Sequence, residues 1–184
     1  MNHPLHVDGT LLTIRPVETG DLEDLARMFR KLSHESTYYR FFSPLPRVPE
    51  PTLRRMIDVD HCRCDAVVAV DGTDIVGIAN YDTPPQPASR EAEVAIVIHD
   101  DWQRRGVGQR LMCSLAALAF SRDYDTFLAR TLPSNRAAIA FVRKLSPRAV
   151  TKFAGGEYEV RLRVDELTCE RPVGTGCREE MRWS

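Results

Sequence analysis

The stretch Ala95–Met112, AIVIHDDWQRRGVGQRLM, decides the expected fold, because a strand, a turn and a helix follow one another within it. We expect the strand over Glu91–His99, where β-branched residues make both faces apolar near its end, as in a central strand. We expect the helix to begin near Arg105 or Gly106. The apolar residues that follow recur at helical spacing, namely Val107, Leu111, Leu115 and Leu118.

The turn between this strand and helix is suited to an anion. The first N–H groups of a helix have no internal partner and lie at the positive end of the helix dipole, which favours phosphate. Gly106 and Gly108 leave the backbone accessible, and Arg104, Arg105 and Arg110 add positive charge around it. The alternative, in which the glycines only ease packing on the sheet and the arginines are solvated, stays open here. No Gly-Lys-Ser/Thr follows, and a third glycine is missing, so neither a Walker-type loop nor the dinucleotide fingerprint is present.

The rest of the chain mixes hairpins with β-α-β connections. Further strands are expected at Leu11–Glu18, on both sides of Asp71-Gly72, over TFLARTL (126–132) and around Gly155-Gly156. Further helices are expected at Asp21–Leu32, at the segment carrying Leu53, Met56 and Ile57, and over PSNRAAIAFVRKL (133–145). Loops are expected at Ser43–Pro51 and Thr83–Arg90. This order predicts an α/β or α+β protein with a mixed sheet, and not a doubly wound dinucleotide fold.

The domain boundaries follow from composition. Residues 1–164 carry the periodic patterns and form one expected domain, while residues 165–184 are polar and aperiodic. We interpret that end as an extension that is either flexible or docked onto a partner.

The bulk composition excludes several classes of protein. A net charge of −1 gives no general attraction to nucleic acid, so any basic site is local. No apolar run is long enough to span a membrane, and the N-terminal residues lack the pattern of a signal peptide, so we expect a cytoplasmic protein.

The 5 cysteines are odd in number and irregularly spaced, which predicts reduced thiols. HCRC at His61–Cys64 lacks a second pair of ligands, so no metal site is expected.

Together, EVAIVI, QRRGVG, QRLMCSLAALA and LPSNRAAIAFVRKL resemble the GNAT superfamily of acyl-CoA-dependent N-acetyltransferases. Gln103, Gly106 and Gly108 match its turn signature, Gln/Arg-x-x-Gly-x-Gly/Ala. The resemblance runs from about Thr13 to Val164. It implies a mostly antiparallel central sheet flanked by helices, with two central strands that splay to admit acetyl-CoA.

The resemblance also assigns expected roles. Turn amides would hold the CoA pyrophosphate, the strand end would pair with pantetheine, and an amide near Ile98 would stabilise the oxyanion. An asparagine and an aromatic residue would contact the pantetheine arm. The implied cofactor-binding residues are Arg104, Arg105, Gly106, Val107, Gly108 and Gln109 in the turn, Ile96, Val97 and Ile98 on the strand, and Asn135 and Phe141 on the later helix.

A narrower resemblance links LSHESTYYRFFSP and AEVAIVIHDDWQRRGVG to the catalytic domain of bacterial Pat-type protein lysine acetyltransferases. It implies a protein lysine as acceptor, with Glu93 as the general base that removes a proton from the amine and Glu91 as the fallback. The alternative for Glu93 is a solvated charge at a strand end. The loop Ser33–Pro49 would form one wall of the acceptor cleft, although its aromatic residues could equally be core.

The expected general acid is missing. Many GNAT enzymes have a tyrosine where this chain has Val142, and Tyr38, Tyr39 and Tyr81 are unranked substitutes. The missing tyrosine leaves open a non-catalytic module that binds or senses acyl-CoA. Acetylation of a small amine or antibiotic is the other function that remains open. A homodimer is also left open.

Overall fold

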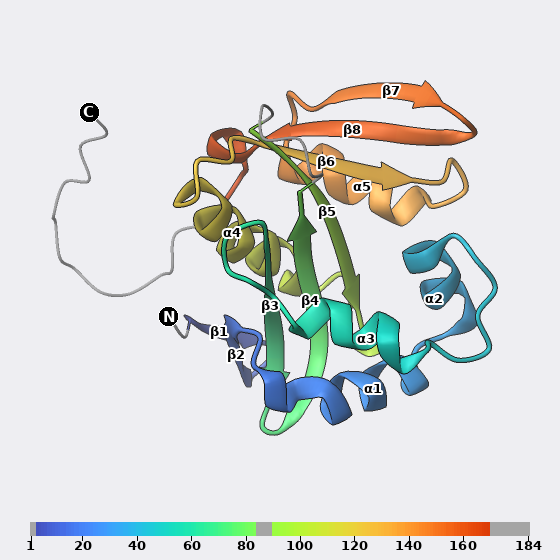
Figure 1. The fold of residues 1–184 in the computed structure, drawn as a ribbon, viewed down its shortest axis with the longest axis vertical. Coiled ribbons are helices and arrows are strands. Elements are labelled where there is room, and N and C mark those ends of the chain that lie inside the picture. The colour runs from blue at the N-terminus through green and yellow to red at the C-terminus, as the bar shows by residue number, and fades with distance from the viewer. Residues whose placement is uncertain (1–2, 84–89, 170–184) are drawn as a thin grey trace, which may run out of the picture.

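The computed structural model describes residues 3–83 and 90–169, which form an eight-stranded sheet with helices on both faces (Figure 1). The strands are β1 (His3–Val7), β2 (Thr10–Pro16), β3 (Cys64–Asp71), β4 (Asp74–Asp82), β5 (Glu91–Ile98), β6 (Thr126–Thr131), β7 (Val150–Ala154) and β8 (Glu157–Arg163). Their order is β1-β2-β3-β4-β5-β6-β8-β7, and every neighbouring pair is antiparallel except β5 and β6. The expected mixed, mostly antiparallel sheet is confirmed.

Five α-helices and three 3₁₀ turns cover the sheet within the described residues. They are α1 (Leu22–Lys31), α2 (His34–Phe41), α3 (Glu50–Ile57), α4 (Val107–Phe120) and α5 (Arg136–Leu145), with η1 (Thr19–Asp21), η2 (Asp100–Trp102) and η3 (Val164–Glu166). None of these helices is long and apolar enough to cross a membrane.

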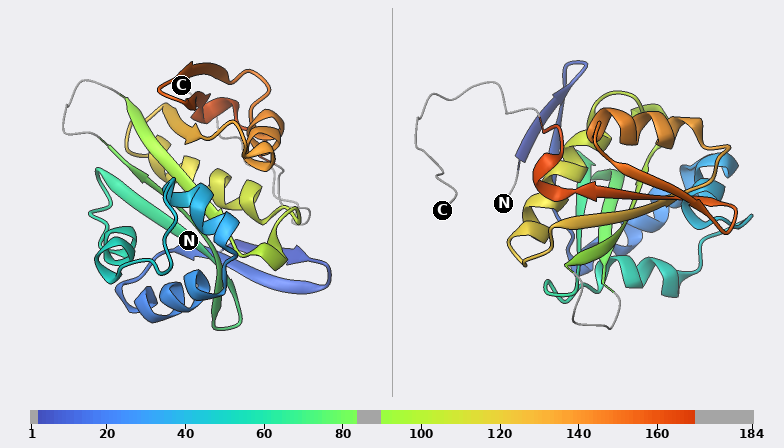
Figure 2. Two further views of the ribbon diagram at one scale, coloured as in Figure 1. Left: turned by 90° about the vertical axis from the view of Figure 1, so that its right-hand side faces the viewer. Right: turned by 90° about the horizontal axis from the view of Figure 1, so that it is seen from above.

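The core has two layers because side chains alternate along each strand. Val67 and Ala69 of β3 face α4, whereas Ala66, Val68 and Val70 face α1 and α3. The left view of Figure 2 shows α1 and α3 on one side of the sheet and α4 and α5 on the other. Burial on both faces explains why β3 and β4 read as continuous apolar runs.

The central strands β5 and β6 diverge, as expected. They pair in parallel from Glu91 opposite Thr126 to Val94 opposite Ala129, and the pairing then stops. β5 continues to Ile98, hydrogen-bonded on its other side to β4, while β6 turns away (Figure 1). One edge of β5 is therefore not covered by β6 over its last four residues, Ala95–Ile98.

Two elements escaped the sequence-based prediction. β1 pairs with β2 through a turn at Asp8 and Gly9, which both have positive φ. Its sequence contains two histidines and a proline, so it lacks the apolar alternation that predicts a strand. α2 occupies part of the expected loop Ser33–Pro49. It begins where the Ser33 side chain accepts a hydrogen bond from the Ser36 amide, and it ends at Phe42 in a left-handed conformation.

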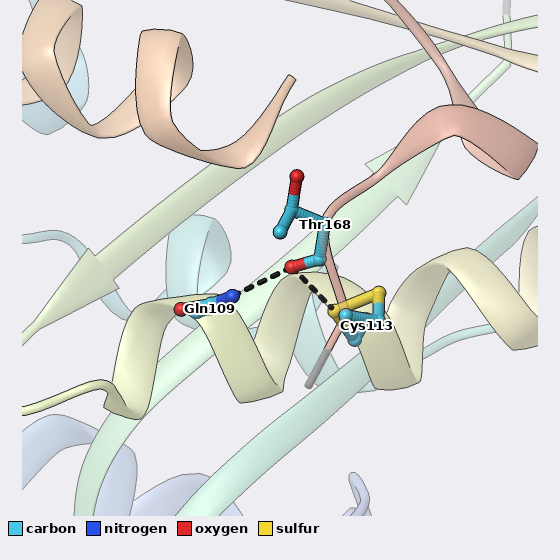
Figure 3. Close-up of a disulfide and its surroundings, with 4 residues drawn as sticks. Gln109, Cys113 and Thr168 are labelled. Atoms are coloured by element: carbon cyan, nitrogen blue, oxygen red, sulfur yellow. Dashed lines mark hydrogen bonds between the residues drawn. A yellow bond between two sulfur atoms is a disulfide. The ribbon is translucent and has the colours of Figure 1, made fainter. Parts of the chain in front are cut away.

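The prediction of reduced thiols is wrong for one pair of cysteines. Cys113 in α4 and Cys169 form a disulfide across 56 residues of sequence (Figure 3). The Gln109 side chain also donates to the Thr168 carbonyl, at 2.6 Å. The two cysteines meet because η3 turns the chain back across α4 after β8, a tertiary path that cysteine spacing does not reveal.

The first residues of the predicted extension pack on the domain. Leu167 is buried in the core on the α4 side, and the Thr168 amide donates to the carbonyl of Leu145 at 2.7 Å. The boundary at residue 164 stays a prediction. Residues 84–89, in the expected loop Thr83–Arg90, and residues 170–184 lie outside the described residues.

Candidate active site

The turn after β5 leads into the N-terminus of α4 through η2. Gly106 caps the helix with φ 86°, a left-handed conformation that suits glycine, and α4 starts at Val107. A Cβ placed on Gly106 would meet no atom within 4 Å among the described residues, so the space in front of the turn is open. This geometry is what a backbone anion site requires.

Two side chains of the turn contact other residues of the chain, although the sequence predicted them as part of the anion site. The Arg105 guanidinium pairs with Asp8 at 3.4 Å and lies over the Trp102 ring. The Gln109 side chain is buried and donates to Thr168. The predicted pyrophosphate site would therefore depend mainly on the backbone amides, with exposed Arg104 beside them.

A cavity of about 350 Å³ passes through the gap between β5 and β6. It is lined on one sheet face by Glu93 and Arg130, and on the other by Phe141 and Leu145. Residues of both faces line it because the strands have separated. The cavity therefore reaches both faces of the sheet at this gap.

Several predicted cofactor residues meet beside this gap. A Cβ on Gly108 would lie 3.5 Å from the Phe141 ring and 3.7 Å from Cδ1 of Ile96, so the turn, β5 and α5 converge there. Asn135 lines the cavity, and its Oδ1 accepts the Ala138 amide at 3.0 Å as the cap of α5. By contrast, the Val97 side chain is buried on the α1 and α3 face.

Glu93 lies at the mouth of the cavity, and its side chain is about half exposed. Its Oε1 accepts a hydrogen bond from Nη1 of Arg130 at 2.9 Å. Glu91 lies two residues farther from the divergence, does not line the cavity, and accepts from Nε of Arg161 at 2.9 Å. The geometry therefore favours Glu93 over Glu91 as a group that could meet an acceptor.

The end of α2 forms a wall of this cavity through Tyr39, Arg40, Phe41 and Phe42. Arg40 donates to Oδ1 of Asn80 at 2.9 Å. Burial lowers the pKa of the Arg40 guanidinium to about 10, and nearby Glu93 acts against that decrease. A cation and a carboxylate therefore share the cavity.

The three tyrosines considered as acids separate by position. Tyr39 lines the cavity and donates to the Ser134 carbonyl at 3.2 Å. Tyr81 belongs to the core against Tyr124 and Phe127, and burial raises its pKa. Tyr38 does not line the cavity, whereas Val142, at the position of the missing tyrosine, does.

Arg40, Arg130 and Asp100 also belong to this site and its wall, and the sequence patterns did not predict them. A charge inside the apolar strand TFLARTL was a usable signal for Arg130. The role of Asp100 depends on α2, which the sequence pattern did not predict.

Asp100 in η2 joins the α2 wall to the turn. Its carboxylate accepts hydrogen bonds from the Ser33 amide at 2.8 Å, the Ser33 hydroxyl at 2.9 Å and the Ser36 hydroxyl at 2.6 Å. Gln103 of the turn signature donates to the Ser36 hydroxyl and to the Ile98 carbonyl, both at 3.1 Å. Burial opposes ionisation of Asp100, but the bonds from Ser36 and Ser33 outweigh it, so its pKa lies below the ordinary value.

Asp100→Asn is expected to lower the free energy of unfolding at pH 7 by about 1–2 kcal/mol, because charge-assisted bonds in a partly exposed network are lost. A carboxylate with a lowered pKa stabilises the fold above its unfolded pKa, and that contribution is lost as the pH falls through the folded pKa. The difference between wild type and variant should therefore shrink below about pH 4. Urea unfolding at a series of pH values measures this difference in the free energy of unfolding. A difference that does not change with pH would contradict the role given to the ionised Asp100 carboxylate.

Gly106→Asp is expected to weaken CoA binding about tenfold more than Gly106→Asn does. Both side chains fit the open space and tolerate positive φ comparably, so the pair isolates the repulsion between a carboxylate and the pyrophosphate. Calorimetric titration at low and high salt measures it, and the gap should narrow with salt. Equal affinities at low salt would refute the predicted pyrophosphate site.

Comparisons with known proteins agree on the family. The model of the "Acetyltransferase (GNAT) family" matches residues 26–146. The chain is 32% identical to acetyltransferase Pat of Mycolicibacterium smegmatis over 145 residues, covering 76% of this chain but only 41% of that protein. It is 27% identical to acetyltransferase PA5475 of Pseudomonas aeruginosa over 150 residues, covering 76% and 80% respectively.

A solved structure gives the same result. The GNAT domain of S. lividans PAT superposes with a TM-score of 0.81 at 29% identity, covering 88% of this chain and 96% of that domain.

Proposed function

The chain belongs to the acetyltransferase (GNAT) family. We propose that it transfers the acetyl group of acetyl-CoA to a lysine side chain of a protein, with Glu93 as the general base. Acyl transfer from acetyl-CoA is the chemistry of the family, so the donor and the reaction type follow from membership. The acceptor and the roles of individual residues are the proposed part.

The observation that carries the proposal is the coincidence of three features along β5 and the turn that follows it. The strand separates from β6, its turn opens into the Gly106 cap of α4, and Glu93 borders the resulting cavity. We propose that the turn amides of 104–109 bind the pyrophosphate and that Ile96–Ile98 pair with pantetheine along the uncovered edge. Asn135 and Phe141 would flank the pantetheine arm.

The reaction proposed at this cavity is direct attack. Glu93 accepts a proton from the ammonium, directly or through one water, because an amine with a pKa near 10.4 is mostly protonated at neutral pH. The amine nitrogen then bonds to the thioester carbon, and the backbone amide near Ile98 stabilises the oxyanion. Collapse of the tetrahedral intermediate breaks the carbon–sulfur bond, the thiolate leaves with the electron pair, and the second proton of the attacking nitrogen passes to the thiolate or to water, which leaves the neutral amide.

No protein acid is assigned to that last step. A thiol has a pKa near 8.5, far below that of an amine, so the thiolate can depart as an anion. This accounts for Val142 at the cavity wall without a substitute tyrosine.

The lysine acceptor is implied by the resemblance to Pat-type protein lysine acetyltransferases; the chain is similar to acetyltransferase Pat but spans less than half of that protein. An acceptor screen tests it: folded proteins, lysine peptides and small amines are incubated with labelled acetyl-CoA. Labelled protein with acetyl-lysine identified by mass spectrometry is the expected result. Turnover of small amines alone would show that the protein is a small-amine acetyltransferase. CoA binding without any transfer would show that it is a non-catalytic acyl-CoA sensor, the alternative that Val142 leaves open.

We also propose a cytoplasmic protein, and a homodimer stays an open alternative to a monomer. The need for acetyl-CoA supports the compartment, whereas the Cys113–Cys169 disulfide is unusual for a cytosolic protein. Alkylation of free thiols in intact cells, followed by mass spectrometry, shows which state those cysteines have there. Light scattering after gel filtration tests the dimer.

A further inference from the structure

Arg130 carries the one charge of the segment TFLARTL, and the structure gives it two carboxylate partners. Its Nη1 donates to Oε1 of Glu93 at 2.9 Å, and its Nε lies 3.9 Å from Oε1 of Glu159. Arg130 and Glu159 are direct cross-strand neighbours on β6 and β8. Glu159 therefore orients the Arg130 guanidinium from one side, and the guanidinium binds Glu93 on the other.

The place of this ion pair in the sheet is specific. The last paired residues of β5 and β6 are Val94 and Ala129, so Arg130 is the first β6 residue beyond the pairing. Glu93 is opposite Leu128, two residues before Arg130 on the same face, the diagonal spacing at which long side chains meet. The bond thus crosses from one strand to the other where their backbones separate.

Stability alone does not account for such a pair. The side chains of Arg130 and Glu93 are 38% and 51% exposed, and ion pairs at that exposure contribute about 0–1 kcal/mol. Orientation is the larger effect, because a half-exposed glutamate has several rotamers and only some bring its carboxylate to an amine. One oxygen bonded to Arg130 leaves the other to accept a proton.

We propose that Arg130 is a positioning residue for acetyl transfer, which fixes the Glu93 carboxylate at the cavity mouth so that it meets the acceptor amine. This inference rests on the proposed function, since it needs Glu93 to act as the base. Arg40 also faces Glu93, but its guanidinium donates a hydrogen bond to Asn80, so it adds charge without fixing the carboxylate.

The same sheet offers a matched control. Arg161 donates to Glu91 at 2.9 Å, the same distance as in the Arg130–Glu93 bond, and neither residue lines the cavity. Arg161→Gln therefore removes an equivalent ion pair without changing the orientation of Glu93.

The test is a double-mutant cycle on kcat at saturating acetyl-CoA and acceptor, with Arg130→Gln, Glu93→Gln and both together. Arg130→Gln is expected to lower kcat about 10- to 100-fold with KM for acetyl-CoA and Tm nearly unchanged, because a misplaced group costs up to about 10²-fold. Arg130→Lys should recover part of the rate, and Arg161→Gln should have wild-type kcat. In the Glu93→Gln background, Arg130→Gln should have no further effect.

Each other outcome counts against a different statement. If Arg130→Gln loses no more rate than Arg161→Gln, or if its loss multiplies with that of Glu93→Gln, Arg130 does not act through Glu93. If Glu93→Gln retains the wild-type rate, the proposed base is wrong and the positioning role falls with it. The first two results leave the proposed function standing, and the third does not.

Discussion

Glu93→Gln is expected to lower kcat for acetyl transfer by about 10²- to 10⁴-fold, the usual contribution of a general base. Glutamine keeps the shape of the side chain and can still accept from Arg130, so the loss reports the proton acceptor. The half-exposed side chain lies outside the core, so stability should change little. Steady-state kinetics with saturating acetyl-CoA measures kcat, and calorimetric titration should give an unchanged affinity for CoA.

Glu91→Gln is the matched comparison, because Glu91 lies on the same strand and in an equivalent ion pair. A loss of rate in Glu91→Gln with normal turnover in Glu93→Gln would identify the fallback residue as the base. Normal turnover in both would mean that neither carboxylate serves.

Replacing both Cys113 and Cys169 by serine is expected to lower the free energy of unfolding by about 4 kcal/mol. A crosslink across 56 residues removes much of the conformational freedom of the unfolded chain, and that restriction disappears with the bond. The hydrogen bonds of Thr168 to Gln109 and Leu145 remain in the folded state, so the variant should fold and merely unfold at lower denaturant. Guanidinium chloride unfolding of the oxidised proteins measures the difference.

Cys62→Ser is the control, since Cys62 is an exposed free thiol and its replacement should leave the midpoint unchanged. Adding a dithiol reductant should bring the wild type to the stability of the double serine variant. A wild type that is insensitive to the reductant, and as stable as the double variant, would show that the disulfide does not form in solution.

The parts of the fold that were predictable are those with strong local patterns. The turn at Gly106 and Gly108, the hairpin at Asp71-Gly72 and the apolar runs of β3 to β5 each carry their own signal in the sequence. The splay came from family resemblance, and the register of β5 against β6 confirms it. Glu93 was singled out in the same way and stays a prediction.

The missed features depend on tertiary contacts. α2 has little apolar periodicity and is held by hydrogen bonds that Ser33 and Ser36 donate to Asp100, which is distant in sequence. Cys113 meets Cys169 because of the path that the chain takes after β8. Glu93 meets Arg130 because of the register between β5 and β6. Such pairings arise when elements assemble, so single-sequence patterns cannot contain them.

The short parallel pairing of β5 with β6 is also a boundary between two parts of the sheet. Strands β1 to β5 form one antiparallel unit and β6 to β8 another, and four register positions join them. Cooperative opening tends to follow such boundaries, so the two units are expected to behave as separate foldons in amide exchange. The disulfide ties α4, which packs on the first unit, to the chain that leaves the second. The disulfide is therefore expected to limit how far the two units can separate when they open.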